Sequence, residues 1–179
     1  MIIPMMNPDG VVLGNSRTGA AGKDLNREFR SKNKFLFPEV HMLKNLIAKI
    51  QETNEIDMFL DFHGHSRKKN MFLFGPNFNL TQPEYYRARV MPKFLSQLTP
   101  TFRYFGCDYR LPPTKFSTAR GVMLNEFSIS YVFTIETSVG LFYDYDALKD
   151  LPFTVKKWKN IGVDLCKAVR QYFESVEQY

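Results

Sequence analysis

The sequence predicts an α/β fold, in which a mixed, mostly parallel twisted sheet carries helices on both faces. Apolar runs of strand length alternate along the chain with longer stretches of helical periodicity, which is the order that βαβ units produce. A chain of 179 residues is long enough to bury a sizeable core. Because no linker, repeat or low-complexity segment divides it, we expect one domain over residues 1–179.

The strands are predicted from short apolar or β-branched runs. Met58 to Phe62 has the character of a buried strand. Tyr131 to Thr137 alternates and is β-branched, which is typical of a strand and puts Glu136 near its carboxyl end. The segment Asn7-Pro8-Asp9-Gly10 is expected to form a turn. In chain order, strands are expected near 1–6, 57–62, 70–74, 121–124 and 131–136.

The helices are predicted from apolar residues that recur at spacings of three and four. Pro38 opens the first helix, and Pro92 is expected to kink or divide the second. The third helix is the longest, and Pro152 lies near its start. The helices are expected near 38–52, 83–98 and 152–174, the last with Val155, Trp158, Ile161, Leu165, Val169 and Phe173 on one face.

The composition narrows the classes of partner. Hydrophobic residues make up 44% and charged residues 23%, which are ordinary values for a soluble globular chain. Cys107 and Cys166 are too few for a disulfide framework, which favours a reducing compartment. No apolar run has the length of a membrane span, no signal peptide is visible, and no nucleic-acid motif is present. The net charge of +6 favours an acidic partner. We expect neither a membrane nor a nucleic acid as the partner.

The stretch from Asp61 to Ser66 carries the first candidate for chemistry. His63 follows a predicted strand and opens a polar, turn-prone tetrad, His-Gly-His-Ser. Ligands bind at the carboxyl ends of strands in open α/β sheets, so His63 is a candidate metal ligand or general base. Asp61 could orient its imidazole. The alternative is a loop histidine that is merely satisfied by hydrogen bonds.

Charged residues on other stretches extend this candidate site. Glu136 follows Phe133, Thr134 and Ile135, where a carboxylate would be costly to bury without a partner. It therefore lies either at a rim or in a pocket that raises its pKa, as a general base requires. The alternative is a set of ordinary polar loop residues. The arginines that could hold carboxylates through bidentate contacts are Arg17, Arg27 and Arg120.

Four motifs occur in an order that resembles the zinc metallocarboxypeptidases. They are Asn-Pro-Asp-Gly at 7–10, Asp-Leu-Asn-Arg at 24–27, Asp-Phe-His-Gly-His-Ser at 61–66 and Phe-Thr-Ile-Glu-Thr-Ser at 133–138. The resemblance covers roughly residues 1–140. The finer resemblance is to the cytosolic carboxypeptidase branch, which shortens glutamate chains and tails on tubulin. It rests on Asn15-Ser16-Arg17, on Ser66-Arg67-Lys68-Lys69-Asn70 and on Thr118-Ala119-Arg120.

The resemblance implies roles for six residues. His63 corresponds to a zinc ligand, and Glu136 to the general base that activates zinc-bound water. Asn26 and Arg27 correspond to the pair that holds the terminal carboxylate of the substrate. Arg17 corresponds to the arginine that stabilises the oxyanion. Arg120 stands where the branch places a basic residue that faces the side chain of the terminal glutamate. We expect these residues to cluster around one cleft.

The sequence departs from the family at the zinc ligands. The family's first two ligands come from a His-x-x-Glu motif upstream of the Asn-Pro-Asp-Gly turn, and this sequence begins at Met1, about six residues before that turn. Neither His41 nor His65 replaces them. Catalytic zinc needs about three protein ligands, so we expect the carboxyl-terminal portion of a catalytic domain that binds zinc weakly and is inactive alone.

Two interpretations of function follow. The protein in intact form is a cytosolic zinc carboxypeptidase that removes terminal glutamates from polyglutamylated proteins such as tubulin. Alternatively, it is a shortened pseudoenzyme that serves as a structural or binding component of a microtubule or axonemal assembly. Either interpretation implies a cytoplasmic location, extending to the cilium or axoneme. The expected partners are acidic peptide tails, tubulin and neighbouring protein chains.

Overall fold

The computed structural model describes residues 1–176 and divides into two compact units. Unit 1 consists of Met1–Phe59 and Leu111–Val132. Unit 2 consists of Leu60–Arg110 and the chain from Phe133 onward. The prediction of one catalytic domain over 1–179 stays a prediction.

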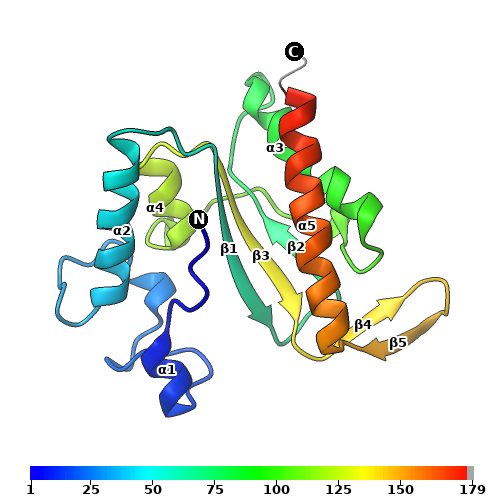
Figure 1. The fold of residues 1–179 in the computed structure, drawn as a ribbon, viewed down its shortest axis with the longest axis horizontal. Coiled ribbons are helices and arrows are strands. Elements are labelled where there is room, and N and C mark those ends of the chain that lie inside the picture. Colours follow the sequence, from blue (N-terminus) through cyan, green and yellow to red (C-terminus); the bar gives the residue numbers. More distant parts are fainter. Residues whose placement is uncertain (177–179) are drawn as a thin grey trace. The chain divides into compact units, whose positions relative to one another are not determined.

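Unit 1 is a helical unit whose core lies between two helices, α2 and α4 (Figure 1). Its helices, including 3₁₀-helices η, are α1 (Pro8–Leu13), η1 (Leu25–Arg27), α2 (Pro38–Gln51), η3 (Pro113–Lys115) and α4 (Ala119–Asn125). Val40 and Ile47 of α2 and Val122 and Met123 of α4 are buried in one hydrophobic cluster. Because apolar positions three or four apart share a helix face, α2 turns one stripe to this core, whereas α4 is buried over the five consecutive residues from Ala119 to Met123.

Unit 2 carries most of the β-structure, and two of its strands, β1 and β3, begin in the residues of unit 1. Its strands are β1 (Met58–His65), β2 (Met71–Phe74), β3 (Tyr131–Ser138), β4 (Leu141–Asp144) and β5 (Lys149–Pro152). Its helices are α3 (Pro83–Leu98), η2 (Tyr104–Gly106) and α5 (Val155–Val176). Helices α3 and α5 pack against each other.

The main sheet is mixed and has the strand order β1-β3-β2. Strand β2 pairs antiparallel with β3, with Phe72 opposite Glu136, and β4 pairs antiparallel with β5. Figure 1 shows β1 and β3 running in the same direction. The expectation of a mostly parallel sheet therefore fits only in part. The cause is the connection 66–70 between β1 and β2, which is too short for the crossover that a parallel return requires.

Two of the predicted strands are wrong. Residues 1–6 form no strand, and Met1 and Ile2 are 80% and 89% exposed. Residues 121–124 lie in α4, because Thr118 caps this helix by accepting a hydrogen bond from the N–H of Gly121 at 3.2 Å. The predicted turn at 7–10 is instead the start of α1, where the Asn7 side chain accepts from the N–H of Gly10 at 3.0 Å. Capping by these side chains favours helices over the expected strand and turn.

The remaining predicted elements are confirmed, with shifted ends. The strands near 57–62, 70–74 and 131–136 are β1, β2 and β3, and the helices near 38–52, 83–98 and 152–174 are α2, α3 and α5. Pro92 lies inside α3 without ending it. On α5, Val155 and Trp158 are 64% and 41% exposed, so the predicted apolar face is displaced from the buried one. No helix within 1–176 is both long and apolar enough to cross a membrane.

Two glycines give a matched test of α4. A Cβ at Gly121 would lie 2.6 Å from the carbonyl oxygen of Lys115 and 2.8 Å from Cα of Phe116, whereas a Cβ at Gly162 of α5 has nothing within 4 Å. Gly121→Ala is expected to lower the free energy of unfolding by about 1–3 kcal/mol through overpacking. Gly162→Ala is expected to raise it by about 0.5–1 kcal/mol. Urea unfolding of both variants checks this, and equal effects would contradict the packing of α4.

Candidate active site

Asp24 organises the first group of predicted site residues, which lies in unit 1. Its Oδ1 accepts a hydrogen bond from the backbone N–H of Asn26 at 2.9 Å and so caps η1. Its Oδ2 accepts from Nε of Arg17 at 2.7 Å and lies 4.0 Å from Nη1 of Arg27. One carboxylate therefore holds the turn and two guanidinium groups in place.

Asn26 joins this turn to the start of α4. Its Oδ1 accepts a hydrogen bond from the backbone N–H of Ala119 at 2.8 Å. A second contact runs parallel to it, because the N–H of Phe29 donates to the carbonyl oxygen of Ser117 at 3.2 Å. These two bonds hold η1 beside the first turn of α4, and Arg120 is the next residue along that turn.

Lys115 belongs to the same group, although the sequence analysis did not single it out. Burial lowers the pKa of Lys115, and the positive charges of Arg27, Arg17 and Arg120 lower it further. Arg120 is itself only 5% exposed. Lys115 stands five positions before Arg120 in the sequence, but among scattered lysines nothing in the sequence marks it. The cationic cluster thus consists of Arg17, Arg27, Lys115 and Arg120.

Asp24 contributes a negative charge among the positive charges of the cationic cluster. Burial alone would raise the pKa of Asp24, but hydrogen bonds from Arg17 and the N–H of Asn26, with the charge of Arg27, hold that pKa below its usual value. Asp24 is therefore ionised at neutral pH. Guanidinium and ammonium groups gathered at a partly buried position have the chemistry that binds carboxylates.

The second group of predicted residues lies in unit 2, on β1 and β3. Asp61 and His63 are two positions apart on β1 and so share one face of the strand. Nε2 of His63 lies 2.6 Å from Oδ2 of Asp61, and both side chains are partly buried. A carboxylate on one ring nitrogen fixes the orientation of an imidazole, as it does for histidines that bind metals.

His65 has a structural role in the same strand. Its Nδ1 accepts hydrogen bonds from the backbone N–H groups of Arg67 and Lys68 at 3.1 and 2.9 Å. Its ring packs edge-on against Phe72. The tetrad from His63 is not a turn, since β1 continues through His65. A Cβ at Gly64 would lie 2.7 Å from Cγ1 of Val139, so that side chain would have to shift.

Glu136 lies on β3, which is the neighbour of β1 in the sheet. The strand is buried from Val132 through Ile135 and becomes partly exposed at Glu136. The structure therefore brings His63 and Glu136 to adjacent strands, near the carboxyl ends of both. The choice between a rim position and a pocket for Glu136 stays a prediction.

The six predicted residues thus fall into two groups. Arg17, Asn26, Arg27 and Arg120 lie in unit 1, whereas His63 and Glu136 lie in unit 2. The prediction that all six surround one cleft stays a prediction.

The described residues fit one ligand of a zinc site and not a complete set. His63 with Asp61 has the chemistry of an imidazole ligand and its carboxylate partner. Residues 1–176 contain no group of three His, Cys, Asp or Glu side chains that could hold a metal ion, whereas catalytic zinc takes about three protein ligands.

Comparison with known sequences points to one family. The family model described as zinc carboxypeptidase matches residues 1–140. Cytosolic carboxypeptidase 2 of Mus musculus is 36% identical over 172 residues, which cover 96% of this chain and 20% of the mouse protein. Cytosolic carboxypeptidase 1 of Xenopus laevis is 32% identical over 178 residues, and this alignment covers 92% of this chain and 14% of the Xenopus protein. The chain therefore spans a fifth or less of these curated relatives.

Solved structures show the same fold. A metallo-carboxypeptidase from Burkholderia cenocepacia superposes with a TM-score of 0.81 at 24% identity, over 98% of this chain and 44% of that one. A metallo-carboxypeptidase from Pseudomonas aeruginosa, solved in complex with (2-guanidinoethylmercapto)succinic acid, has a TM-score of 0.77 at 26% identity, over 96% and 45%. The predicted carboxypeptidase-like α/β fold is confirmed.

The depressed pKa of Asp24 predicts a dependence of stability on pH. Its pKa is lower in the folded chain than in the unfolded chain, so its charged form stabilises the fold above the unfolded pKa. This contribution is lost as the pH falls below the unfolded pKa and through the lower folded pKa. Asp24→Asn is expected to make the free energy of unfolding fall less steeply with decreasing pH in this acid range. Urea unfolding at several pH values measures this slope. Asp57→Asn, an exposed carboxylate of the same unit, is the control, and a slope unchanged by Asp24→Asn would contradict the prediction.

The contact between His63 and Asp61 predicts a tautomer. Because Nε2 of His63 faces a carboxylate oxygen at 2.6 Å, the neutral imidazole is expected to carry its proton on Nε2, with the Nδ1 lone pair suited to binding a metal. Long-range ¹H–¹⁵N spectra measure this directly. Asp61→Asn is expected to weaken the preference at His63 and leave His65 unchanged. A proton on Nδ1 of His63 in the unmodified chain would contradict the arrangement.

Proposed function

The chain belongs to the zinc carboxypeptidase family, and on that premise we propose that it acts in a cytosolic zinc carboxypeptidase. The proposed reaction removes glutamates from the carboxyl ends of acidic polypeptides such as tubulin tails. The relatives named cytosolic carboxypeptidases support the cytosolic location. The proposal extends to microtubule and ciliary structures, where such tails occur.

The cationic cluster is the observation that carries this proposal. Arg27 and Asn26 are held by Asp24 and by the N–H of Ala119, which fits them to take the terminal carboxylate of a substrate. Arg120 and Lys115 add two further positive charges, which suit a second carboxylate on the terminal side chain. A terminal glutamate offers both carboxylates. The Pseudomonas aeruginosa relative was solved with a succinic acid derivative that carries two carboxylates and a guanidino group, which supports carboxylate binding and not the choice of glutamate.

The remaining residues have roles on the reacting side of the substrate. His63, oriented by Asp61, would be one zinc ligand, and zinc when bound supplies the Lewis acid that polarises the scissile carbonyl. Glu136 would take a proton from the attacking water and deliver it to the leaving amine. Arg17 would stabilise the negative charge that develops on the carbonyl oxygen.

Peptide binding tests the proposed role of the cationic cluster. A labelled peptide that ends in two glutamates is expected to lose at least tenfold in affinity when its carboxyl end is amidated. Each lost charge-assisted hydrogen bond is worth about 1.5–3 kcal/mol, and about 1.4 kcal/mol is tenfold. Arg27→Gln is expected to reproduce this loss for the free peptide only. Lys49→Gln, which removes the same charge from an exposed position on α2, is the control. Equal binding of the free and amidated peptides would refute the proposal.

Lys115 tests the preference for glutamate. Replacing the terminal glutamate by glutamine is expected to weaken binding to the unmodified chain, and Lys115→Gln is expected to reduce that difference. Lys115 is more suitable than Arg120 for this test because it is only partly buried, whereas removal of the buried Arg120 could disturb folding. A preference for glutamate that Lys115→Gln leaves intact would exclude Lys115 from recognition.

Release of glutamate tests whether the chain is inactive alone, as a single zinc ligand predicts. The chain supplied with Zn²⁺ is incubated with the same peptide, and free glutamate is measured beside Glu136→Gln. Binding without release is the expected result. Release that Glu136→Gln abolishes would assign catalysis to the chain itself and would exclude the alternative, an inactive binding component of a microtubule or axonemal assembly.

A further inference from the structure

Helix α5 has two faces of different character. Its buried residues recur at spacings of three and four, and they pack within unit 2, where α3 is the neighbouring helix. They are Ile161, Leu165, Ala168 and Tyr172. A set of exposed residues also recurs at these spacings, at positions i, i+3, i+7, i+11 and i+14. These residues therefore form one stripe along the helix. This stripe, the basic face of α5, consists of Lys156, Lys159, Val163, Lys167 and Arg170.

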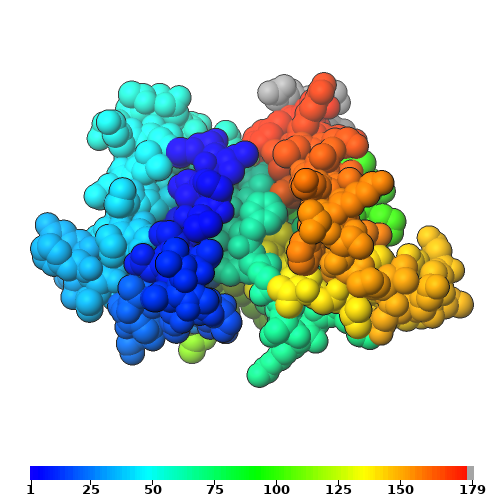
Figure 2. All heavy atoms as spheres, turned by 60° about the horizontal axis from the view of Figure 1, so that its bottom comes forward, coloured from blue at the N-terminus to red at the C-terminus, as the bar shows by residue number. Residues whose placement is uncertain are grey.

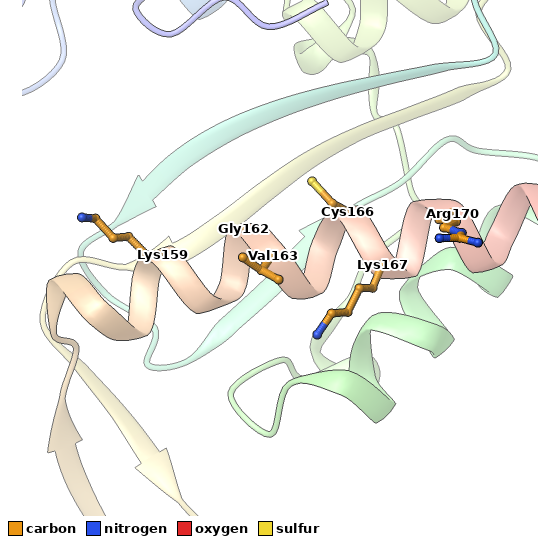
Figure 3. A pocket seen from close by; sticks show the side chains of 6 residues that line it. All are labelled: Lys159, Gly162, Val163, Cys166, Lys167 and Arg170. Carbon is orange, nitrogen blue, oxygen red and sulfur yellow. The ribbon is translucent and has the colours of Figure 1, made fainter.

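The basic face is fully on the surface of unit 2. Figure 2 shows α5, coloured orange to red, along the exterior of the unit. Figure 3 shows Lys159, Lys167 and Arg170 spaced along the helix, with Gly162, Val163 and Cys166 between them, and these six residues line a shallow depression. Basic side chains thus lie at both ends of the depression, and small, uncharged residues lie at its centre.

The positive charges of this face are only partly balanced. Lys167 pairs with Asp164 at 3.6 Å and Arg170 with Glu174 at 2.6 Å, but the side chains of Lys167 and Arg170 stay 59% and 80% exposed. Such exposed pairs contribute little and exchange readily. Within residues 1–176, no ion pair involves Lys156 or Lys159. The face therefore keeps a net positive potential that a negatively charged partner can use.

The chemistry of the face favours a polypeptide over a membrane. A helix that binds a membrane surface inserts its apolar face between the lipids, and the apolar face of α5 is already buried in unit 2. From Lys156 to Arg170 the helix rises about 21 Å, which matches an extended segment of about six residues. Carboxylates of such a segment can reach both basic ends, while side-chain methylene groups lie on Val163 in the centre.

We propose that the basic face of α5 docks an acidic polypeptide segment. In Figures 1 and 3 the amino-terminal end of α5 lies near the carboxyl ends of β1 and β3. An acidic chain held along α5 would therefore have one end directed to the edge that carries His63 and Glu136. The docking surface belongs to unit 2 and the cationic cluster to unit 1, and the docking surface adds affinity that does not depend on the terminal residue.

Binding of an amidated dodecaglutamate peptide tests this proposal. Amidation removes the terminal carboxylate, so the result does not depend on the proposed carboxypeptidase function. The triple variant Lys159→Gln, Lys167→Gln and Arg170→Gln is expected to bind at least tenfold more weakly by fluorescence anisotropy. Its control replaces Lys32, Lys34 and Lys49, three exposed lysines of unit 1, by glutamine and thus matches the change in charge. Circular dichroism confirms that both variants are folded.

A fluorophore on Cys166 gives a local readout. Burial raises the pKa of the Cys107 thiol to about 11, whereas Cys166 is exposed, so labelling near neutral pH favours Cys166. The peptide is expected to change the emission of this label, and the change is expected to weaken with rising salt. The same affinity loss in both triple variants, or an unchanged emission, would overturn the proposal. Tighter α5-dependent binding of phosphatidylserine vesicles or duplex DNA would overturn it as well.

Discussion

The hydrogen bond from the N–H of Ala119 to Oδ1 of Asn26, 2.8 Å long, is the contact on which the candidate carboxylate site depends. It joins two segments that are 93 residues apart in sequence. Together with the bond from the N–H of Phe29 to the carbonyl oxygen of Ser117, it holds Arg27 of η1 beside Lys115 and Arg120. Asp24 and Thr118 support this junction from each side by capping η1 and α4. Gly121 allows the close approach, because a side chain there would meet the backbone of Lys115 and Phe116.

The sequence predicted the elements whose signals are local. The periodicity of 83–98 and the proline at its start were enough for α3, and the β-branched run from Tyr131 was enough for β3. Elements that depend on one capping side chain were missed: α1 depends on Asn7, and α4 depends on Thr118. The hairpin of β4 and β5 was not among the predicted elements, because Asn70 holds it from a distance through hydrogen bonds with the N–H and carbonyl of Tyr143.

The candidate site was predictable where a motif marked it. Asn26, Arg27, His63 and Glu136 lie in motifs with a recognisable order, and the structure gives His63 its partner Asp61. Lys115 was not predictable, because its significance arises from three guanidinium groups that folding places around it. The basic face of α5 was likewise hidden, since the predicted apolar face included Trp158 and Val155, both of which are exposed. Charge that is scattered in the sequence becomes concentrated only when helices form.

The most direct test of the carboxylate site is an NMR titration of the side-chain Nε–H signals of Arg17, Arg27 and Arg120 with N-acetylglutamate. The account predicts that the signals of Arg27 and Arg120 shift together with a single dissociation constant. It also predicts that Asn26→Ala abolishes this shared response, whereas Asp61→Asn preserves it. Separate responses of the two arginines, or a shared response that survives Asn26→Ala, would contradict the claim that the junction of η1 and α4 builds one site.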